Sequence, residues 1–315
     1  MAERFVGSLG HQHQTVLSAI NASSSGDIIT VTDGRTYTER LDDIQLNDIT
    51  IRSSRTNPNN FPVLRLFFNS NTLNHINNWV FGAVIMEPNS NSRFTFNLKN
   101  ITFRRCVFRN YDYLCACDCQ AGRVKRFESC VFHDFSDYVF NAQQNYSDQA
   151  LVVRNCTFHN CVRIFRNDFH NGENAATPQI TNSVFTASPN IAPDVQDGAQ
   201  QPSNKRYWLM RQFRHCTFTN DPQTTNSQLG AECLVNINEN VIYAQSGAKA
   251  QPGDFKISNN PAVRNSGSDA LGYSPDLGGL SRTSPYDRGA WEFDGEPPPP
   301  VKKKILPYIN YQGAF

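Results

Sequence analysis

The chain lacks the features that mark membrane proteins, secreted proteins and strongly charged proteins. None of its apolar runs approaches the roughly 18 residues of a membrane-spanning helix, so we expect no membrane partner. Residues 1–6 lack the apolar core and the cleavage site of a signal peptide, so ordinary secretion is not expected. Lys and Arg total 29 against 28 Asp and Glu, a formal net charge of +1. With so little excess charge, nucleic acid is not an expected partner.

A short pattern recurs five times along the chain. Each copy is a small residue, any residue and a phenylalanine, and the copies begin 24, 26, 27 and 33 residues apart. A period between about 20 and 50 residues is typical of a solenoid. The copies are rich in Val, Phe and Thr and are bounded by turn-forming residues, which predicts strands and not helices. We therefore expect an all-β fold, a single-stranded right-handed parallel β-helix with an N-terminal cap and an extended C-terminal arm. The copies are Cys106-Val107-Phe108, Cys130-Val131-Phe132, Cys156-Thr157-Phe158, Ser183-Val184-Phe185 and Cys216-Thr217-Phe218.

The nine cysteines form an odd set, so at least one has no disulfide partner. Stacking of the repeat should align Cys106, Cys130 and Cys156 in an inward column, about 4.8 Å apart. Parallel side chains at that spacing do not reach the roughly 3.8 Å between Cβ atoms that a relaxed disulfide prefers. The sequence therefore predicts buried, reduced thiols, in keeping with assembly in a reducing cytoplasm.

Two passages carry a resemblance to a known family. Residues 26–31, 37–39 and 49–51 resemble the opening coils of pectate-lyase-like β-helix proteins, in which an amphipathic N-terminal segment caps the stack. Residues 269–293 resemble the closing segment of bacterial and phage β-helix proteins. This resemblance implies that residues 289–293 form a final strand, with Trp291 and Phe293 closing the far end.

The resulting division of the chain has four parts. An N-terminal entry or cap segment with a short helical pattern (residues 1–24) leads into the parallel β-helix (residues 25–265). Within it, Asn240-Val241-Ile242 follows Cys216 by 24 residues and is expected to continue the thiol column. A C-terminal capping segment (residues 266–296) and a Pro- and Lys-rich docking arm (residues 297–315) follow.

The docking arm joins a stiff proline run to a basic cluster and an apolar end. Such an arm suits docking onto another subunit, or folding back onto its own β-helix, and the sequence leaves both open. The residues expected to dock are Lys302, Lys303, Lys304, Ile305, Leu306, Tyr308, Tyr311 and Phe315.

Two outward stripes are expected on the stacked coils. Arg109, His133 and His159 each follow a repeated phenylalanine and should align, together with Thr186 and Thr219, into a polar surface stripe that could bind a glycan. We favour a solvated ladder, in which neighbouring Asn and Asp side chains (Asn110, Asp134, Asn160, Asn220) stabilise turns. Val107, Val131 and Val184 should form an apolar stripe suited to docking.

Candidate chemistry is sparse. Asp134 with Asp137, and Asp112 with Asp118, offer carboxylates for glycoside hydrolysis, and Arg104 and Arg105 offer bases for elimination, but none carries a distinguishing motif. A phosphate-binding glycine loop and a serine nucleophile elbow are both absent. Cys115, Cys117 and Cys119 could share a strand face and ligate zinc, although buried thiols fit the spacing better. We expect neither cofactor nor metal.

These features favour a non-enzymatic structural protein of a bacteriophage virion, because the chain resembles short phage-encoded β-helix proteins. Such proteins decorate or cement capsids or form tail-associated spikes, and are commonly trimers that bind other virion subunits. The alternatives are a carbohydrate-active tailspike, acting as polysaccharide lyase or hydrolase on a host surface glycan, and a glycan-binding module without turnover.

Overall fold

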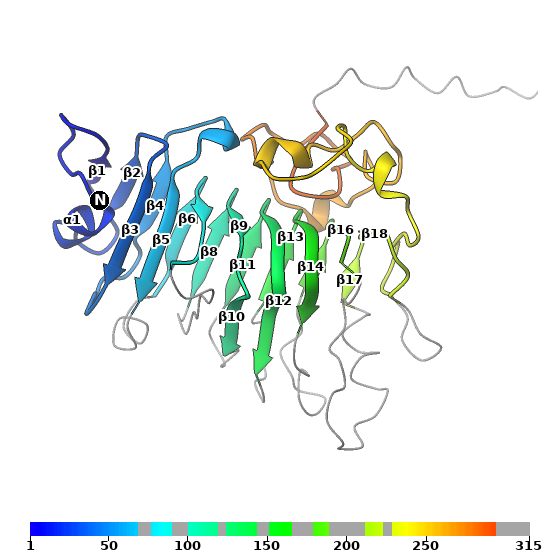
Figure 1. Ribbon diagram of the computed structural model, residues 1–315, viewed down its shortest axis with the longest axis horizontal. Coiled ribbons are helices and arrows are strands. Elements are labelled where there is room, and N and C mark those ends of the chain that lie inside the picture. Colours follow the sequence, from blue (N-terminus) through cyan, green and yellow to red (C-terminus); the bar gives the residue numbers. More distant parts are fainter. Residues whose placement is uncertain are drawn as a thin grey trace, which may run out of the picture.

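The computed structural model describes residues 1–68, 77–89, 100–118, 124–143, 151–165, 179–188, 212–222 and 229–293, without the side chains of 113–118, 141–143 and 271. Its strands form two long parallel sheets, and the chain alternates between them to build a β-solenoid (Figure 1). The predicted all-β parallel β-helix is therefore confirmed.

Sheet A consists of β1 (Glu3–Val6), β2 (Ile28–Val31), β4 (Thr50–Ser53), β6 (Trp79–Gly82), β8 (Ile101–Arg104), β11 (Lys125–Glu128), β13 (Leu151–Arg154), β15 (Gln179–Thr181) and β17 (Phe213–Arg214). Sheet B consists of β3 (Thr36–Leu41), β5 (Val63–Phe68), β7 (Ile85–Met86), β9 (Val107–Arg109), β12 (Val131–Gln143), β14 (Thr157–Phe165), β16 (Val184–Thr186) and β18 (Thr217–Phe218), with β10 (Tyr113–Asp118) paired to β12. The helices in the described ranges are α1 (Val16–Asn21) and four short 3₁₀ helices, η1 (Pro58–Asn60), η2 (Glu239–Val241), η3 (Pro252–Phe255) and η4 (Asp269–Leu271).

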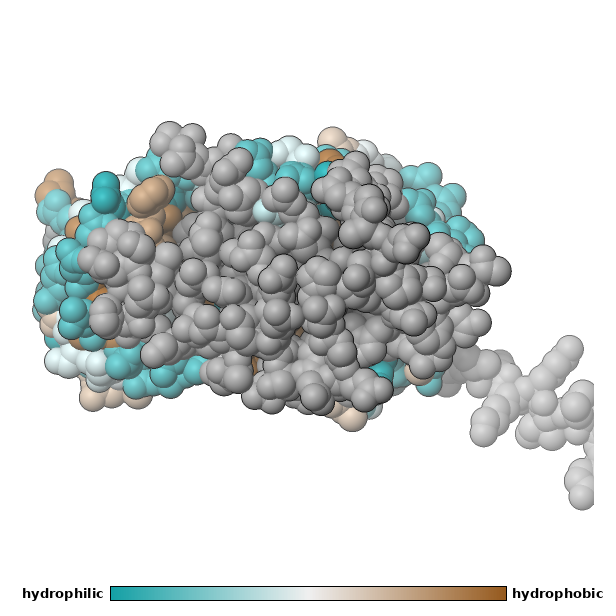
Figure 2. All heavy atoms as spheres, turned by 90° about the horizontal axis from the view of Figure 1, so that it is seen from below, coloured by the Kyte–Doolittle hydropathy of each residue, from teal (hydrophilic) through white to brown (hydrophobic). Residues whose placement is uncertain are grey.

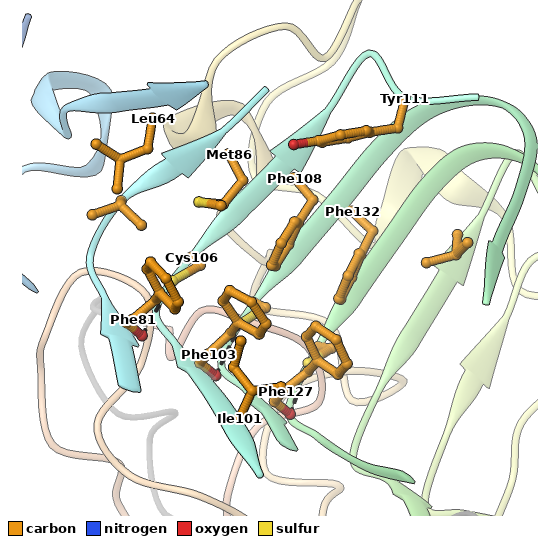
Figure 3. Packing of buried hydrophobic residues seen from close by; sticks show 14 of the residues in the cluster. Leu64, Phe81, Met86, Ile101, Phe103, Cys106, Phe108, Tyr111, Phe127 and Phe132 are labelled. Atoms are coloured by element: carbon orange, nitrogen blue, oxygen red, sulfur yellow. Dashed lines mark hydrogen bonds between the residues drawn. The ribbon is translucent and has the colours of Figure 1, made fainter. Parts of the chain in front are cut away.

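The core is built from columns of aromatic rings, because parallel in-register pairing repeats each inward position at every coil. Phe103 stacks between Phe81 and Phe127, with ring centroids 5.2 Å from each (Figure 3). On sheet B, Phe108 and Phe132 stack at 4.9 Å. The repeated phenylalanine of the sequence is thus a core position, and its burial favours stacking of the coils.

The thiol column exists as predicted. Cys106, Cys130 and Cys156 are fully buried and free. Each Sγ donates to a backbone carbonyl of the preceding coil, such as Cys106 Sγ to Phe81 O at 3.4 Å. Burial raises the pKa of Cys106 and Cys130 well above the ordinary thiol value, so these groups stay protonated.

The column does not continue at Asn240, so that prediction is wrong. A parallel bridge joins Thr217 to Leu234, which places Cys233 next to Cys216 after a coil of only 17 residues. Residues 239–241 form η2 instead, and Ile242 packs on the outside of sheet B. The chain has left the coil path by this point.

Left-handed residues mark the turns of every repeat. The residue before each member of the column has a φ between 50° and 57° in Arg105, Ser129, Asn155, Asn182 and His215. A second set follows the phenylalanines, with φ of 63° at Asn110, 59° at Asp134 and 50° at Asn160, as the turn prediction expected. Asn and Asp tolerate this region better than other side chains.

The N-terminal end of the solenoid is covered by α1. Its N-cap residue Thr15 accepts from Ser18 N at 3.0 Å, and Glu39 Oε1 of the first coil accepts from Val16 N at 2.8 Å. The apolar side of the helix, including Ala19 and Ile20, is buried in the main core. This segment therefore performs the predicted capping.

The C-terminal segment, residues 237–293, runs along the outside of the stack (yellow to orange in Figure 1). Residues 289–293 are not a strand, and Ala290 N donates to Thr157 Oγ1 at 3.0 Å in the middle of sheet B. The prediction that they form a strand closing the far end is therefore wrong. They cover the side of the solenoid, because their apolar residues pack on outward valines.

No helix among the residues that the structure describes has the length and apolarity to cross a membrane. Hydrophilic side chains prevail where Figure 2 shows described residues, and the hydrophobic ones lie in small separate groups.

Candidate functional site

The outward position after each stacked phenylalanine forms one row along sheet B. Pairing aligns Arg109 with His133 and His133 with His159, as the sequence predicted. Glu87 Oε1 lies 2.6 Å from Arg109 Nε, and its Oε2 lies 2.8 Å from Arg65 Nη2. Burial opposes ionisation of Glu87, but the hydrogen bonds from the two arginines outweigh it and lower its pKa. Arg109 is thus held in an ion-paired ladder across three coils.

The C-terminal segment covers the two histidines of this row. Phe255 lies with its ring centroid 5.1 Å from His133 and 5.5 Å from His159, and Tyr243 Oη is 2.7 Å from Thr186 Oγ1. The side chain of His133 is 2% exposed and that of His159 13%. The predicted exposed stripe is therefore wrong at these coils, because residues 237–257 lie over it. Glycan binding by these residues remains a prediction.

Burial also sets the protonation of the row. It lowers the pKa of His159 to about 4, assisted by the neighbouring His133 and Lys249 and opposed by Asp134. His159 is therefore neutral near pH 7. Asp134 Oδ2 lies 2.8 Å from His133 Nδ1, and this contact lowers the pKa of Asp134.

The valine stripe is not an open docking face. Val107, Val131 and Val184 point outward from sheet B, yet each is fully buried. They belong to a second apolar cluster supplied largely by the C-terminal segment, with Ile242, Tyr243, Phe255, Ile257, Leu277, Ala290 and Trp291. At Gly289 the φ is +95°, and a Cβ there would lie 3.2 Å from Val184 Cγ2. The stripe is a docking face, as its apolarity suggested, but its occupant is the chain itself.

The left-handed turn residues fasten this segment with hydrogen bonds. Asn155 Nδ2 donates to Asp287 O at 2.9 Å, and its Oδ1 accepts from Tyr273 N at 2.7 Å. Ser129 Oγ donates to Pro275 O at 2.7 Å, and Arg105 Nε donates to Leu277 O at 3.1 Å. Successive coils therefore bind successive parts of the segment through one equivalent turn position.

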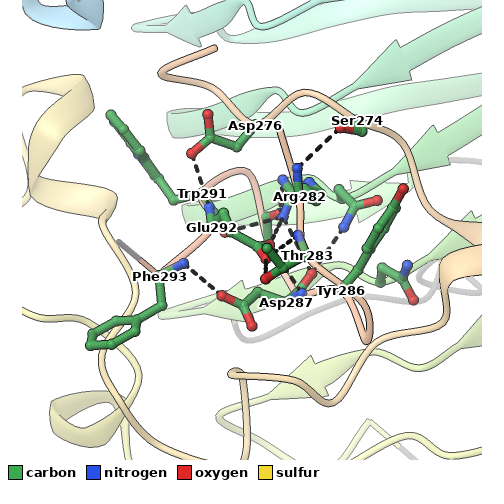
Figure 4. Close-up of polar contacts among 12 residues, drawn as sticks. Ser274, Asp276, Arg282, Thr283, Tyr286, Asp287, Trp291, Glu292 and Phe293 are labelled. Carbon is green, nitrogen blue, oxygen red and sulfur yellow. Dashed lines mark hydrogen bonds and ion pairs between the residues drawn. The ribbon is translucent and has the colours of Figure 1, made fainter. Parts of the chain in front are cut away.

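A buried polar cluster shapes the segment itself (Figure 4). Arg282 Nη1 lies 3.2 Å from Glu292 Oε2, and its Nη2 donates to the carbonyls of Gly289 and Ala290 at 2.9 and 3.0 Å. Asp287 accepts from Asn265 N and Phe293 N, both at 2.6 Å. Desolvation nevertheless raises the pKa of Asp287 to about 6. These contacts fold residues 265–293 into one fixed shape.

The candidate catalytic groups serve structural contacts. Asp134 Oδ1 accepts from Asn160 Nδ2 at 2.7 Å, and Asp137 pairs with Arg163 at 3.4 Å. Arg104 pairs with Glu128 at 3.0 Å. Arg105 lies under the C-terminal segment, where burial lowers its pKa. Asp112 accepts from Ser136 at 2.5 Å, and the side chain of Asp118 lies outside the described residues.

Within the described part of the chain, no group of three or more His, Cys, Asp or Glu side chains is placed to hold a metal ion. The expected buried thiols and the zinc alternative are both untested, since Cys119 and the side chains of Cys115 and Cys117 lie outside that part. The docking arm, residues 297–315, also lies outside it.

Comparison with known protein families gives no family model that matches this chain. No curated protein matches it either. The functional argument therefore depends on the fold and on the contacts described above.

Proposed function

We propose that this chain is a non-enzymatic structural protein of a bacteriophage virion, either a capsid decoration or cement protein or a tail-associated spike. It would act by docking onto neighbouring virion subunits. The observation that carries the proposal is the occupied outer face of sheet B, where the C-terminal segment buries Val107, Val131 and Val184. A face locked in this way suits a rigid building element better than a substrate groove.

The contacts of the candidate catalytic residues support the same proposal. Glycoside hydrolysis needs two carboxylates separated by about 5 to 9.5 Å across the scissile bond, with room for the sugar between them. Asp134 and Asp137 instead hold Asn160 and Arg163. Elimination needs an accessible base, whereas Arg104 is ion-paired and Arg105 is covered. These groups stabilise the solenoid.

The proposal places the protein in the virion, after synthesis in the host cytoplasm. Buried, protonated thiols suit synthesis in a reducing compartment. A homotrimer is the assembly that the resemblance implies, and residues 297–315 are the proposed arm for contact with a neighbouring subunit.

The test is quantitative mass spectrometry of purified virus particles from the source of the chain. Hundreds of copies per particle would indicate capsid decoration or cement, and a few to a few tens would indicate a tail-associated spike. Absence from the particles would overturn the proposal. Depolymerisation of a host surface polysaccharide by the purified full chain would overturn its non-enzymatic part and favour a carbohydrate-active tailspike.

A further inference from the structure

The outer face of sheet A carries two rows of stacked side chains. One row contains Arg52, Arg104, Arg154 and Arg214, and in-register pairing separates each from the next by one intervening coil. Since neighbouring strands lie about 4.8 Å apart, these arginines recur at about 10 Å. The parallel row adds Arg126, which pairs with Thr102 and Val152. Five guanidinium groups therefore line one rigid face.

Three of these arginines lack a partner among the described residues. Arg52 pairs with Glu3 at 2.9 Å and Arg104 pairs with Glu128 at 3.0 Å. The described contacts give the side chains of Arg126, Arg154 and Arg214 neither a hydrogen bond nor an ion pair, and Arg214 is exposed. This face therefore holds uncompensated positive charge on a protein whose formal net charge is only +1.

The composition of the face favours a protein partner. Its cations are all arginines, which form bidentate pairs with carboxylates and are enriched in protein interfaces where lysine is depleted. Val80 and Thr102, which are half-buried, lie in the same row as Arg126 and lose little when a partner desolvates them. Glu3 and Glu128 interrupt the positive charge, so a uniform polyanion would meet like charges on the same face, whereas a mixed protein surface can match both signs.

A second copy of the chain does not supply an obvious match. Among the described acidic residues at the ends of the strands, Glu87 already pairs with Arg65 and Arg109, and Glu128 pairs with Arg104. Neither glutamate is therefore free to face the row of arginines, and an acidic surface of a different protein is the partner that this face fits.

We infer that the outer face of sheet A docks onto an acidic surface of another virion protein, with Arg126, Arg154 and Arg214 as its anchoring residues. The inference rests on the proposed function, because it names the chemistry of the partner that the structural role requires. Electrostatic pairing of this kind fixes the register between two rigid subunits.

The experiment compares arginine modification by phenylglyoxal in the free full chain and in purified particles, read by peptide mass spectrometry. We expect Arg126, Arg154 and Arg214 to be at least tenfold less reactive in particles, while Arg40 and Arg55, which are exposed elsewhere, change less than twofold. If the protein is present in the particles and the three arginines react there as fast as in the free chain, this inference is overturned and the proposed function stays intact. Protein absent from particles would overturn both. Protection that disappears after nuclease or glycosidase treatment would assign the face to a polymer and overturn the inference.

A matched pair of variants gives a second readout. Combined Arg126→Glu, Arg154→Glu and Arg214→Glu should lower incorporation into particles at least tenfold while leaving the melting temperature of the free protein within a few degrees. Combined Arg35→Glu, Arg40→Glu and Arg55→Glu changes the net charge equally on other surfaces and should leave incorporation unchanged. Equal incorporation of both variants would contradict the docking role.

Discussion

Asn182 and Ser268 exchange two hydrogen bonds although 86 residues separate them. Asn182 Nδ2 donates to Ser268 O at 2.7 Å, and Ser268 N donates to Asn182 Oδ1 at 2.9 Å. Gly289 N donates to the backbone carbonyl of the same asparagine at 2.8 Å. One left-handed turn residue thus fixes two separate parts of the C-terminal segment to the solenoid.

Asn182→Ala should therefore lower the free energy of unfolding. The decrease should exceed the cost of placing an alanine in the left-handed backbone conformation. Two hydrogen bonds are lost, and the remaining Ser268 groups lose their partner, which costs about 2–4 kcal/mol. Asn110→Ala is the matched control, because Asn110 also has a positive φ (63°) but lies exposed. It should lose about 1–2 kcal/mol from the left-handed conformation. Equal losses in urea unfolding would show that the side-chain contacts of Asn182 contribute nothing.

Periodicity explains what could be predicted from sequence. Cys106, Cys130 and Cys156 recur at one position of three successive coils, so the place of this column and its inward orientation follow from spacing alone. The contact of Arg282 with Glu292 occurs once, within the C-terminal segment, and the contacts of Phe255 with the two histidines join distant segments. No repeat in the sequence predicts either kind of contact. This is why the outward stripes were predicted as exposed.

The short last coil shows the same limit. Cys233 belongs to the thiol column because the bridge between Thr217 and Leu234 sets its position. Cys233 follows Cys216 by 17 residues, whereas the other copies of the repeat lie 24 to 33 residues apart. Extending the regular spacing therefore placed Asn240, and not Cys233, in the thiol column. Coil length in a solenoid varies with the connection between strands, and sequence spacing alone does not reveal a shortened connection.

Substitutions at Cys156 should depend on side-chain size more than on the thiol. Val84 and Ser183 occupy the same column position in other coils, and Ser183 Oγ donates to Thr181 O at 2.9 Å. Cys156→Ser should therefore cost less than about 1.5 kcal/mol of unfolding free energy. Cys156→Leu should cost about 1–3 kcal/mol, because the extra volume strains a filled column. Urea unfolding checks both, and a larger loss for serine than for leucine would contradict this account.

His159 should make the solenoid less stable in acid. Its pKa falls from the ordinary value of 6.5 to about 4 in the folded chain, chiefly through burial. A lowered pKa favours the neutral folded form above pH 6.5, and this stability is lost as the pH falls from 6.5 through 4. The full effect is about 3 kcal/mol. The charged or titratable neighbours His133, Asp134, Glu239 and Lys249 face the same ring.

The melting temperature of the full chain between pH 7 and pH 4 measures this effect. His159→Gln should flatten the decrease, whereas His11→Gln, at an exposed site, should keep the profile of the unsubstituted chain. An unchanged slope in His159→Gln would assign the acid sensitivity to other groups.

Asp287 should act in the opposite direction. Desolvation raises its pKa from 3.8 to about 6, against the hydrogen bonds from Asn265 N and Phe293 N. A raised pKa favours the protonated folded form, so its contribution is complete below pH 3.8 and is lost as the pH rises through 6. The change is about 3 kcal/mol. Arg282 and Glu292 are the charged groups that face it within the cluster.

Asp287→Asn tests this prediction, because the amide does not titrate. The variant should lose some stability at every pH, since one backbone donor loses its acceptor, but its melting temperature should fall less than that of the unsubstituted chain between pH 4 and pH 7. Asp48→Asn, on an exposed turn, should leave that difference unchanged. Because His159 weakens the fold in acid and Asp287 weakens it toward neutral pH, the two variants should move the pH of maximum stability in opposite directions. His159→Gln should move it lower and Asp287→Asn higher, and a shift in the same direction would contradict the assignment of one of the two groups.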